Sequence, residues 1–231
     1  RRTRTASRSC RWAASTRRRS SVGVGTGAGW VKHRLTLTSP DAQDREQGRA
    51  YVREIIDLAG PLGASAIIGS MQGSHGDEVD RETALGYLGE ALQELGEYAR
   101  QHAVPLIYEP LNRYETNLCC TMADGVRLLE GLGEDLNVVL LADLFHMTYE
   151  DDKPDVLLNA NAHLWHIHVP VPRIDGMSPR PWDEIYVDFL NALRSTGYVA
   201  RISIEDNGGR FKDYQTEARR SIAYLKENWA V

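Results

Sequence analysis

"PLIYEPLNRYETN", residues 105–117, joins an apolar run directly to a cluster of polar and charged side chains. Leu106, Ile107 and Tyr108 lead straight into Glu109, and Glu115 follows within the same stretch. A strand that only fills a core gains nothing from ending in carboxylates, because burying an unpaired charge is costly. A strand whose tip lines a site is the natural context for such residues. The stretch therefore predicts a buried strand followed by a functional loop.

The same pattern of a short apolar strand before a segment of helical period recurs along the chain, giving six β-α units. The predicted strands are SVGVGT (21–26), SAIIGSM (65–71), VPLIYEPL (104–111), LNVVLLADLFHM (136–147), HLWHIHVP (163–170) and ARISIEDN (200–207). The predicted helices lie within residues 44–63, 82–102, 121–133, 153–162, 181–197 and 214–229. Apolar strands that alternate with amphipathic helices are typical of an α/β protein whose parallel sheet is covered by helices.

Two architectures fit such a sheet: a doubly wound open sheet and a (β/α)8 barrel. A dinucleotide-binding open sheet would place a glycine-rich fingerprint between its first strand and helix. The nearest candidate, GVGTGAG at 23–29, runs into Trp30 and Val31 without a helix start, and we expect a glycine-rich loop there. Acidic and imidazole groups end four successive predicted strands, which favours the barrel, where active sites form at that edge.

Composition and charge narrow the class of protein. The chain has 231 residues, 42% of them hydrophobic and 26% charged, and no apolar stretch approaches the length of a membrane span. Residues 1–40 hold ten of the 27 basic side chains and no acidic one. Residues 41–231 therefore carry 17 basic against 32 acidic side chains, a net charge of −15. Such a surface repels phosphate backbones, so we do not expect nucleic acid as a partner. The lack of a long apolar stretch likewise leads us to expect no membrane partner.

The three cysteines indicate no disulfide framework, which favours a cytoplasmic location. Residues 1–19 are rich in arginine and lack any apolar period, so we expect a disordered or artefactual segment ahead of a barrel domain at 20–231. A targeting peptide or a nucleic-acid-binding arm is the alternative. Six readable units fall short of a barrel's eight, and we expect one to two β-α units to be lacking at the start.

Four motifs together resemble a known family. Glu109 with the following PLNRYE, ADLFHM at 142–147, HIH at 166–168 and SIEDNGG at 203–209 are similar, in order and spacing, to the sugar phosphate isomerase/epimerase proteins of the xylose isomerase-like TIM-barrel superfamily, with the D-tagatose 3-epimerase group as the best model. The resemblance implies metal ligation by Glu109, Asp143, His168 and Glu205. It also implies proton transfer by the two glutamates, and substrate binding by Glu115, His146 and Arg173.

The implied activity is that of a divalent-metal-dependent ketose or sugar phosphate isomerase/epimerase. Three carboxylates and one imidazole suit Mn²⁺ first, with Mg²⁺ or Co²⁺ as alternatives. A cation on the ketose oxygens would acidify the adjacent C–H, and two glutamates on opposite faces of the resulting enediolate could remove and return the proton. The partner is then a small sugar, and a homo-oligomer is compatible with these features.

Each residue also has a structural interpretation. Glu109 could form an ion pair with Arg113, and Asp143 could cap a helix in ADLFHM. His166 and His168 share a strand face, and either could be a core histidine; only the resemblance selects His168 as the ligand. Two further functions stay open for the whole chain: a non-catalytic remnant of the family, and a DNA-repair endonuclease of the three-zinc type, which the acidic body disfavours.

Overall fold

The computed structural model describes residues 23–150, 152–170, 184–205 and 213–229. Within these ranges six parallel strands form one sheet, and each strand pairs with the next in chain order. The strands are β1 (Gly23–Gly25), β2 (Ser65–Ile68), β3 (Leu106–Tyr108), β4 (Val138–Asp143), β5 (Leu164–Pro170) and β6 (Arg201–Glu205). The predicted α/β architecture is confirmed as a curled half-barrel with fewer units than the eight of a closed barrel.

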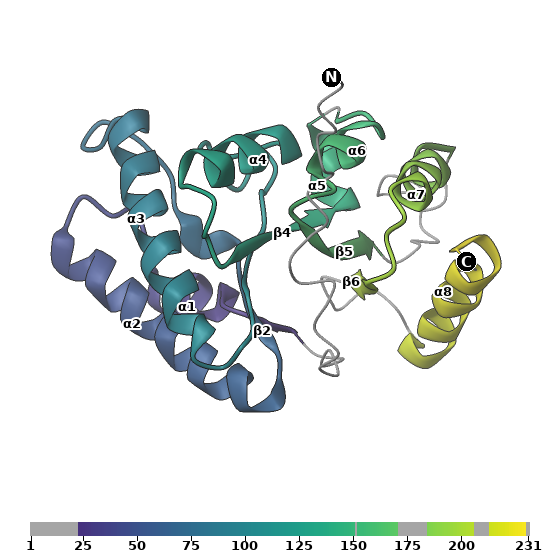
Figure 1. The fold of residues 1–231 in the computed structure, drawn as a ribbon, viewed down its shortest axis with the longest axis horizontal. Coiled ribbons are helices and arrows are strands. Elements are labelled where there is room, and N and C mark those ends of the chain that lie inside the picture. Colours follow the sequence, from purple (N-terminus) through teal and green to yellow (C-terminus); the bar gives the residue numbers. More distant parts are fainter. Residues whose placement is uncertain (1–22, 151, 171–183, 206–212, 230–231) are drawn as a thin grey trace, which may run out of the picture.

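Helices follow the strands and cover the outside of the curved sheet in an arc that runs from α2 and α3 round to α7 and α8 (Figure 1). The helices are α1 (Gly27–His33), α2 (Ala42–Ala59), α3 (Arg81–Arg100), α4 (Met122–Gly131), α5 (Leu144–Tyr149), α6 (Val156–Ala160), α7 (Glu184–Ser195) and α8 (Tyr214–Trp229), with single 3₁₀ turns at Gly60–Leu62 and Ser70–Gln72. No helix in the described ranges has the length and apolar character that crossing a membrane requires.

Alternation along the strands builds two separate apolar layers. Leu106, Tyr108 and Leu140 face outward and pack with the helices in the main core. Their strand neighbours face the other way and form a small inner cluster of Ile67, Ile107, Val139 and Leu141, against which Trp165 packs. Side chains at successive strand positions point to opposite faces, so residues two positions beyond the inner cluster also face inward. This parity brings Glu109 and Asp143 into the barrel.

Three of the longer helices begin where the sequence provides capping residues. Asp41 caps α2 by accepting from the Gln43 backbone N–H at 2.6 Å. Asp80 caps α3 by accepting from the Thr83 N–H at 3.0 Å. At α4, Thr121 and Asp124 form a reciprocal capping box, which satisfies two backbone donors at once. These caps fix the residue at which each of the three helices begins. They therefore also fix the length of the loop that joins each helix to the strand before it.

β1 lies within the strand predicted at 21–26, but the expectation of a glycine-rich loop is wrong for residues 27–29, which form the start of α1. The helix has no side-chain N-cap that the sequence could reveal. The Thr26 hydroxyl, which precedes the helix, donates instead to the Ile67 carbonyl at 2.9 Å. Gly29 then lies so close to its neighbours that a Cβ there would be 2.6 Å from the Met71 sulfur. Arg34 ends the helix in the left-handed conformation, with φ of 57°. Close packing therefore selects helix here against local propensity.

Candidate metal centre

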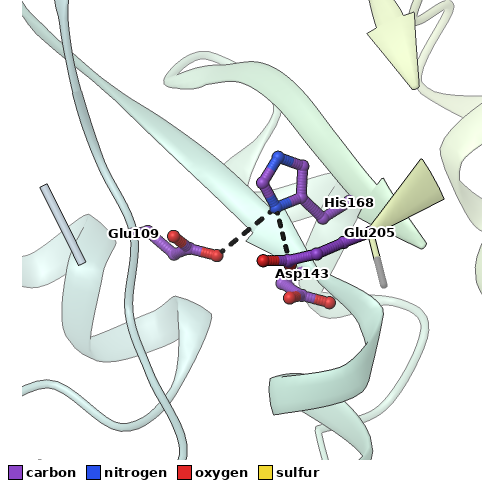
Figure 2. A group of neighbouring side chains, drawn as sticks. All are labelled: Glu109, Asp143, His168 and Glu205. Atoms are coloured by element: carbon purple, nitrogen blue, oxygen red, sulfur yellow. Dashed lines mark hydrogen bonds and ion pairs between the residues drawn. The ribbon is translucent and has the colours of Figure 1, made fainter. Parts of the chain in front are cut away.

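Four side chains from successive strands converge at the carboxyl edge of the sheet (Figure 2). Glu109 follows β3, Asp143 ends β4, His168 lies in β5 and Glu205 ends β6. One potential ligand atom from each lies within 4.8 Å of the others. The His168 ring lies between the two glutamates, with Nδ1 3.0 Å from Glu205 Oε2 and 3.7 Å from Glu109 Oε1. The structure thus brings together all four residues expected as metal ligands.

Glu109 reaches the site because its surroundings leave space for a carboxylate. Its backbone N–H donates to the Ile68 carbonyl at 2.9 Å, which continues the β2–β3 pairing beyond the last strand residue. Its own carbonyl accepts from Gln72 Nε2 at 3.3 Å. A Cβ added to Gly69 would lie 3.0 Å from Glu109 Oε2, so the absence of a side chain at Gly69 accommodates the carboxylate. The glutamate is buried, with 8% of its surface exposed.

Asp143 combines the two interpretations that the sequence left open. It caps α5, since Oδ1 accepts from the Phe145 backbone N–H at 2.7 Å. Its second oxygen, Oδ2, lies 3.7 Å from His146 Nε2. A carboxylate has two oxygens, so capping a helix with one leaves the other for the cluster. The structure gives the two residues of the alternative ion pair other partners: the Arg113 guanidinium binds Glu150 at 2.9 Å, and Glu109 Oε1 lies 3.7 Å from His168 Nδ1.

A β-bulge decides which side chains of β5 face the cluster. Leu140 pairs with Leu164, whereas the next residue, Leu141, pairs with His166, so Trp165 is the extra residue. Leu164 packs in the outer core and Trp165 against the inner cluster. After the bulge the alternation resumes with His166 and His168 inward. Uninterrupted alternation from Leu164 would have turned both imidazoles toward the helices.

The electrostatics of the cluster favour a bound cation. Burial raises the pKa of Glu109 well above its ordinary value, and the Asp143 and Glu205 carboxylates raise it further. Burial, followed by repulsion from Glu205, likewise raises the pKa of Asp143. A hydrogen bond with His168 holds the pKa of Glu205 well below its usual range. A divalent ion would relieve this repulsion, and a set of three carboxylates and one imidazole fits a hard cation.

A second group of polar residues lies beside the four. His146 is buried, and burial lowers the pKa of its imidazole to about 4, which leaves the ring neutral. The Asn112 backbone N–H donates to His146 Nδ1 at 3.3 Å, so the ring proton lies on Nε2, which faces Asp143. Glu115 Oε1 lies 3.7 Å from His146 Nδ1 and accepts from Asn112 Nδ2 at 3.3 Å. Arg173, the third expected substrate residue, lies outside the described residues.

Asn112 is the residue that sequence reasoning missed. Its side-chain amide contacts both His146 and Glu115, and its Oδ1 accepts from the Tyr114 backbone N–H at 3.0 Å. The asparagine therefore holds the turn after β3 and joins it to α5. Its place midway between Glu109 and Glu115 in a polar loop was a signal, although an asparagine in a loop is most often only a turn residue.

Comparison with known proteins agrees with this geometry. The sequence model described as "Xylose isomerase-like TIM barrel" matches residues 12–228. The chain is 28% identical to D-psicose 3-epimerase of Agrobacterium fabrum over 176 residues, which is 73% of this chain and 59% of that protein. It is 26% identical to L-ribulose 3-epimerase of Mesorhizobium japonicum over 195 residues, covering 80% and 63%. The chain thus spans about three fifths of the length of these curated relatives.

A solved structure shows the same fold. D-psicose 3-epimerase of Clostridium cellulolyticum H10, determined with D-tagatose, superposes with a TM-score of 0.71 at 21% identity, over 85% of this chain and 75% of that one. The family match extends over most of the sequence, and the half-barrel and its strand-end cluster agree with it. The chain therefore belongs to the xylose isomerase-like TIM-barrel family.

Proposed function

We propose that this protein is a divalent-metal-dependent ketose isomerase or epimerase that works by proton transfer between Glu109 and Glu205. The observation that carries the proposal is the convergence of four ligand-type groups within 4.8 Å at the edge of the sheet. Both curated relatives above bear the names of ketose 3-epimerases, which supports a sugar as substrate. Mn²⁺ is the ion we propose, and the cytoplasm is the compartment, because the cysteines indicate no disulfide framework.

The two glutamates are suited to act from opposite sides. They come from β3 and β6, with β4 and β5 between them, and their carboxylates approach His168 from different directions (Figure 2). Glu109, Asp143, His168 and Glu205 would hold the cation, which would polarise a substrate carbonyl as a Lewis acid. One glutamate then removes the proton from the neighbouring carbon, and the other returns a proton to the opposite face, which inverts that centre. Return at the adjacent carbon, together with passage of a proton from one enediol oxygen to the other, would give isomerisation.

The neighbouring residues would hold the sugar. His146 presents a neutral imidazole and Glu115 a half-exposed carboxylate, and both suit hydrogen bonds to sugar hydroxyls. Asn112 fixes the two relative to each other. We propose Arg173 as a third substrate contact on the basis of its position in the sequence.

The test compares Glu109→Gln and Glu205→Gln with wild type on a panel of ketoses in deuterated solvent. Each substitution keeps an oxygen donor but removes the group that takes up a proton, so turnover should fall about 10²- to 10⁴-fold while Mn²⁺ binding is partly kept. Glu130→Gln, an exposed change on α4, is the control and should leave both unchanged. Solvent deuterium should appear in the wild-type product.

Two outcomes would contradict the proposal. Near-normal turnover in Glu205→Gln would exclude a mechanism with two glutamates. Wild-type protein that binds Mn²⁺ but converts no ketose in the panel would favour the alternative of a non-catalytic remnant of the family.

A further inference from the structure

Two polar side chains lie one step back from the ligands on neighbouring strands. His166 precedes His168 by two residues on β5, and Ser203 precedes Glu205 by two residues on β6. His166 Nε2 lies 2.8 Å from Ser203 Oγ. In the strand register, His168 pairs with Ser203 and His166 with Arg201, so this contact crosses the β5–β6 boundary diagonally. It lies directly behind the pair formed by His168 and Glu205.

The inward position of both polar side chains is imposed by the packing of the strands. Ile202 and Ile204 pack against the outer core, which turns Ser203 and Glu205 inward. On β5, the bulge at Trp165 turns His166 inward. The Tyr198 hydroxyl lies 3.2 Å from the Trp165 carbonyl and 2.6 Å from the Arg201 carbonyl, so it bridges the bulge and the first residue of β6.

His166 also touches the ligand ring itself. The imidazoles of His166 and His168 have centroids 5.1 Å apart and an interplanar angle of 83°, an edge-to-face contact. His166 is buried, with 6% of its surface exposed, so the His168 ring contacts a protein side chain on this side and not solvent. Rotation of the His168 ring toward His166 would have to displace His166. The cross-strand bond to Ser203 opposes that displacement.

We propose that His166, held by Ser203, is a positioning residue that fixes the orientation of His168 and the spacing of β5 and β6, and so sets the affinity of the cation site. The inference rests on the proposed function, because it concerns the same metal centre. Groups behind metal ligands commonly hold the ligands in their binding geometry, and their loss costs about 10- to 100-fold in metal affinity.

The experiment measures Mn²⁺ binding by calorimetry in the full chain, with Mn²⁺ alone as the probe. Ser203→Ala removes the hydroxyl, and His166→Phe keeps a ring but removes the hydrogen bond. Each should weaken Mn²⁺ binding about tenfold or more. The visible absorption of bound Co²⁺ should also change, because that spectrum reports ligand geometry. Ser203→Thr restores a hydroxyl and should recover most of the affinity.

Ile167→Val is the matched control. Ile167 lies between the two histidines on β5, is fully buried and packs in the outer core. Its truncation should lower the Tm of the metal-free chain while leaving Mn²⁺ affinity and the Co²⁺ spectrum as in wild type. If His166 contributes only to stability, Ser203→Ala should behave like this control: its Tm should fall, while Mn²⁺ affinity and the Co²⁺ spectrum stay as in wild type.

The outcomes separate the two proposals. If Ser203→Ala binds Mn²⁺ as tightly as wild type, the positioning role is excluded and the metal centre stands. If wild type binds no Mn²⁺, the proposed function fails and this inference fails with it. If His166→Phe does not fold, Ser203→Ala and Tyr198→Phe give the same comparison. Tyr198→Phe removes only the hydroxyl that bridges the Trp165 and Arg201 carbonyls.

Discussion

At the scale of single residues, Asp143 offers a way to separate helix capping from metal binding. Asp143→Asn keeps the Oδ1 that accepts from Phe145, so the cap on α5 survives, but the carboxylate charge is lost. Mn²⁺ binding should weaken by at least the roughly 10- to 100-fold that loss of supporting groups costs, and excess Mn²⁺ should restore part of the activity. Titration of Mn²⁺ against turnover measures this.

Asp143→Ala is the companion variant. It removes the cap together with the ligand, so its free energy of unfolding in the metal-free chain, measured by urea denaturation, should lie about 0.5–2 kcal/mol below that of Asp143→Asn. Equal stability of the Asn and Ala variants would show that the cap contributes nothing to stability.

Gly69 tests how closely the site is fitted around Glu109. Gly69→Ala places a methyl group 3.0 Å from Glu109 Oε2, so the carboxylate must shift. Turnover and Mn²⁺ affinity should both fall, while the outer core is untouched. Gly76→Ala, where a Cβ meets nothing within 4 Å, is the control and should behave as wild type. Unchanged Mn²⁺ affinity in Gly69→Ala would mean that the carboxylate does not need its present position.

At the scale of elements, two of the three glycines in α3 have opposite expected effects on stability. Gly86 is exposed and a Cβ there meets nothing within 4 Å, so Gly86→Ala should stabilise the protein by about 0.5–1 kcal/mol through helix propensity. Gly96 faces the start of β4, and a Cβ would be 2.8 Å from Val138 Cγ2 and 3.2 Å from the Asn137 carbonyl oxygen. Gly96→Ala should therefore destabilise it. Thermal unfolding of both variants gives the comparison, and equal shifts would contradict it.

The elements were largely predictable because their patterns are local. Each predicted strand contains an observed strand, and the long helices match their apolar periods and caps. The short α1 was missed because its stability comes from close packing of Gly29 against Tyr51 and Met71, which no local pattern encodes. The bulge at Trp165 was equally hidden, since it depends on register with β4 and on Tyr198 from a later loop.

The candidate site was predictable for a different reason. Its residues stand at strand ends, so once the strands are aligned in parallel their tips must meet at one edge. The choice of His168 over His166 needed the family resemblance, because two residues of equal parity share a face. The contacts of Asn112 with His146 could not be inferred, since they depend on how the loop after β3 folds against α5.

At the scale of the whole molecule, the cation site should link stability to pH. Protons compete with Mn²⁺ for Glu109 and Asp143, whose pKa values are raised by burial and mutual repulsion. Raised values mean that protonation begins to oppose metal binding at a higher pH than for ordinary carboxylates, so affinity falls as pH falls. The rise in Tm on adding a fixed excess of Mn²⁺ should therefore be larger at pH 8 than at pH 5.

Calorimetric scans with Mn²⁺ and with a chelator at each pH measure the difference. Glu205→Gln should reduce the rise at both values. A rise in Tm that is the same at both pH values would mean that the raised carboxyl groups take no part in binding.

The four donors stand in or directly after four successive strands, and the last of them, Glu205, ends β6, the last strand among the described residues. The metal centre is therefore complete only after β6 has joined the sheet, a late event if the local β-α contacts before it form first. A cation that needs all four donors cannot then act as a folding nucleus. It should leave the rate of refolding nearly unchanged and slow the rate of unfolding, so that its benefit appears as kinetic lifetime of the native state.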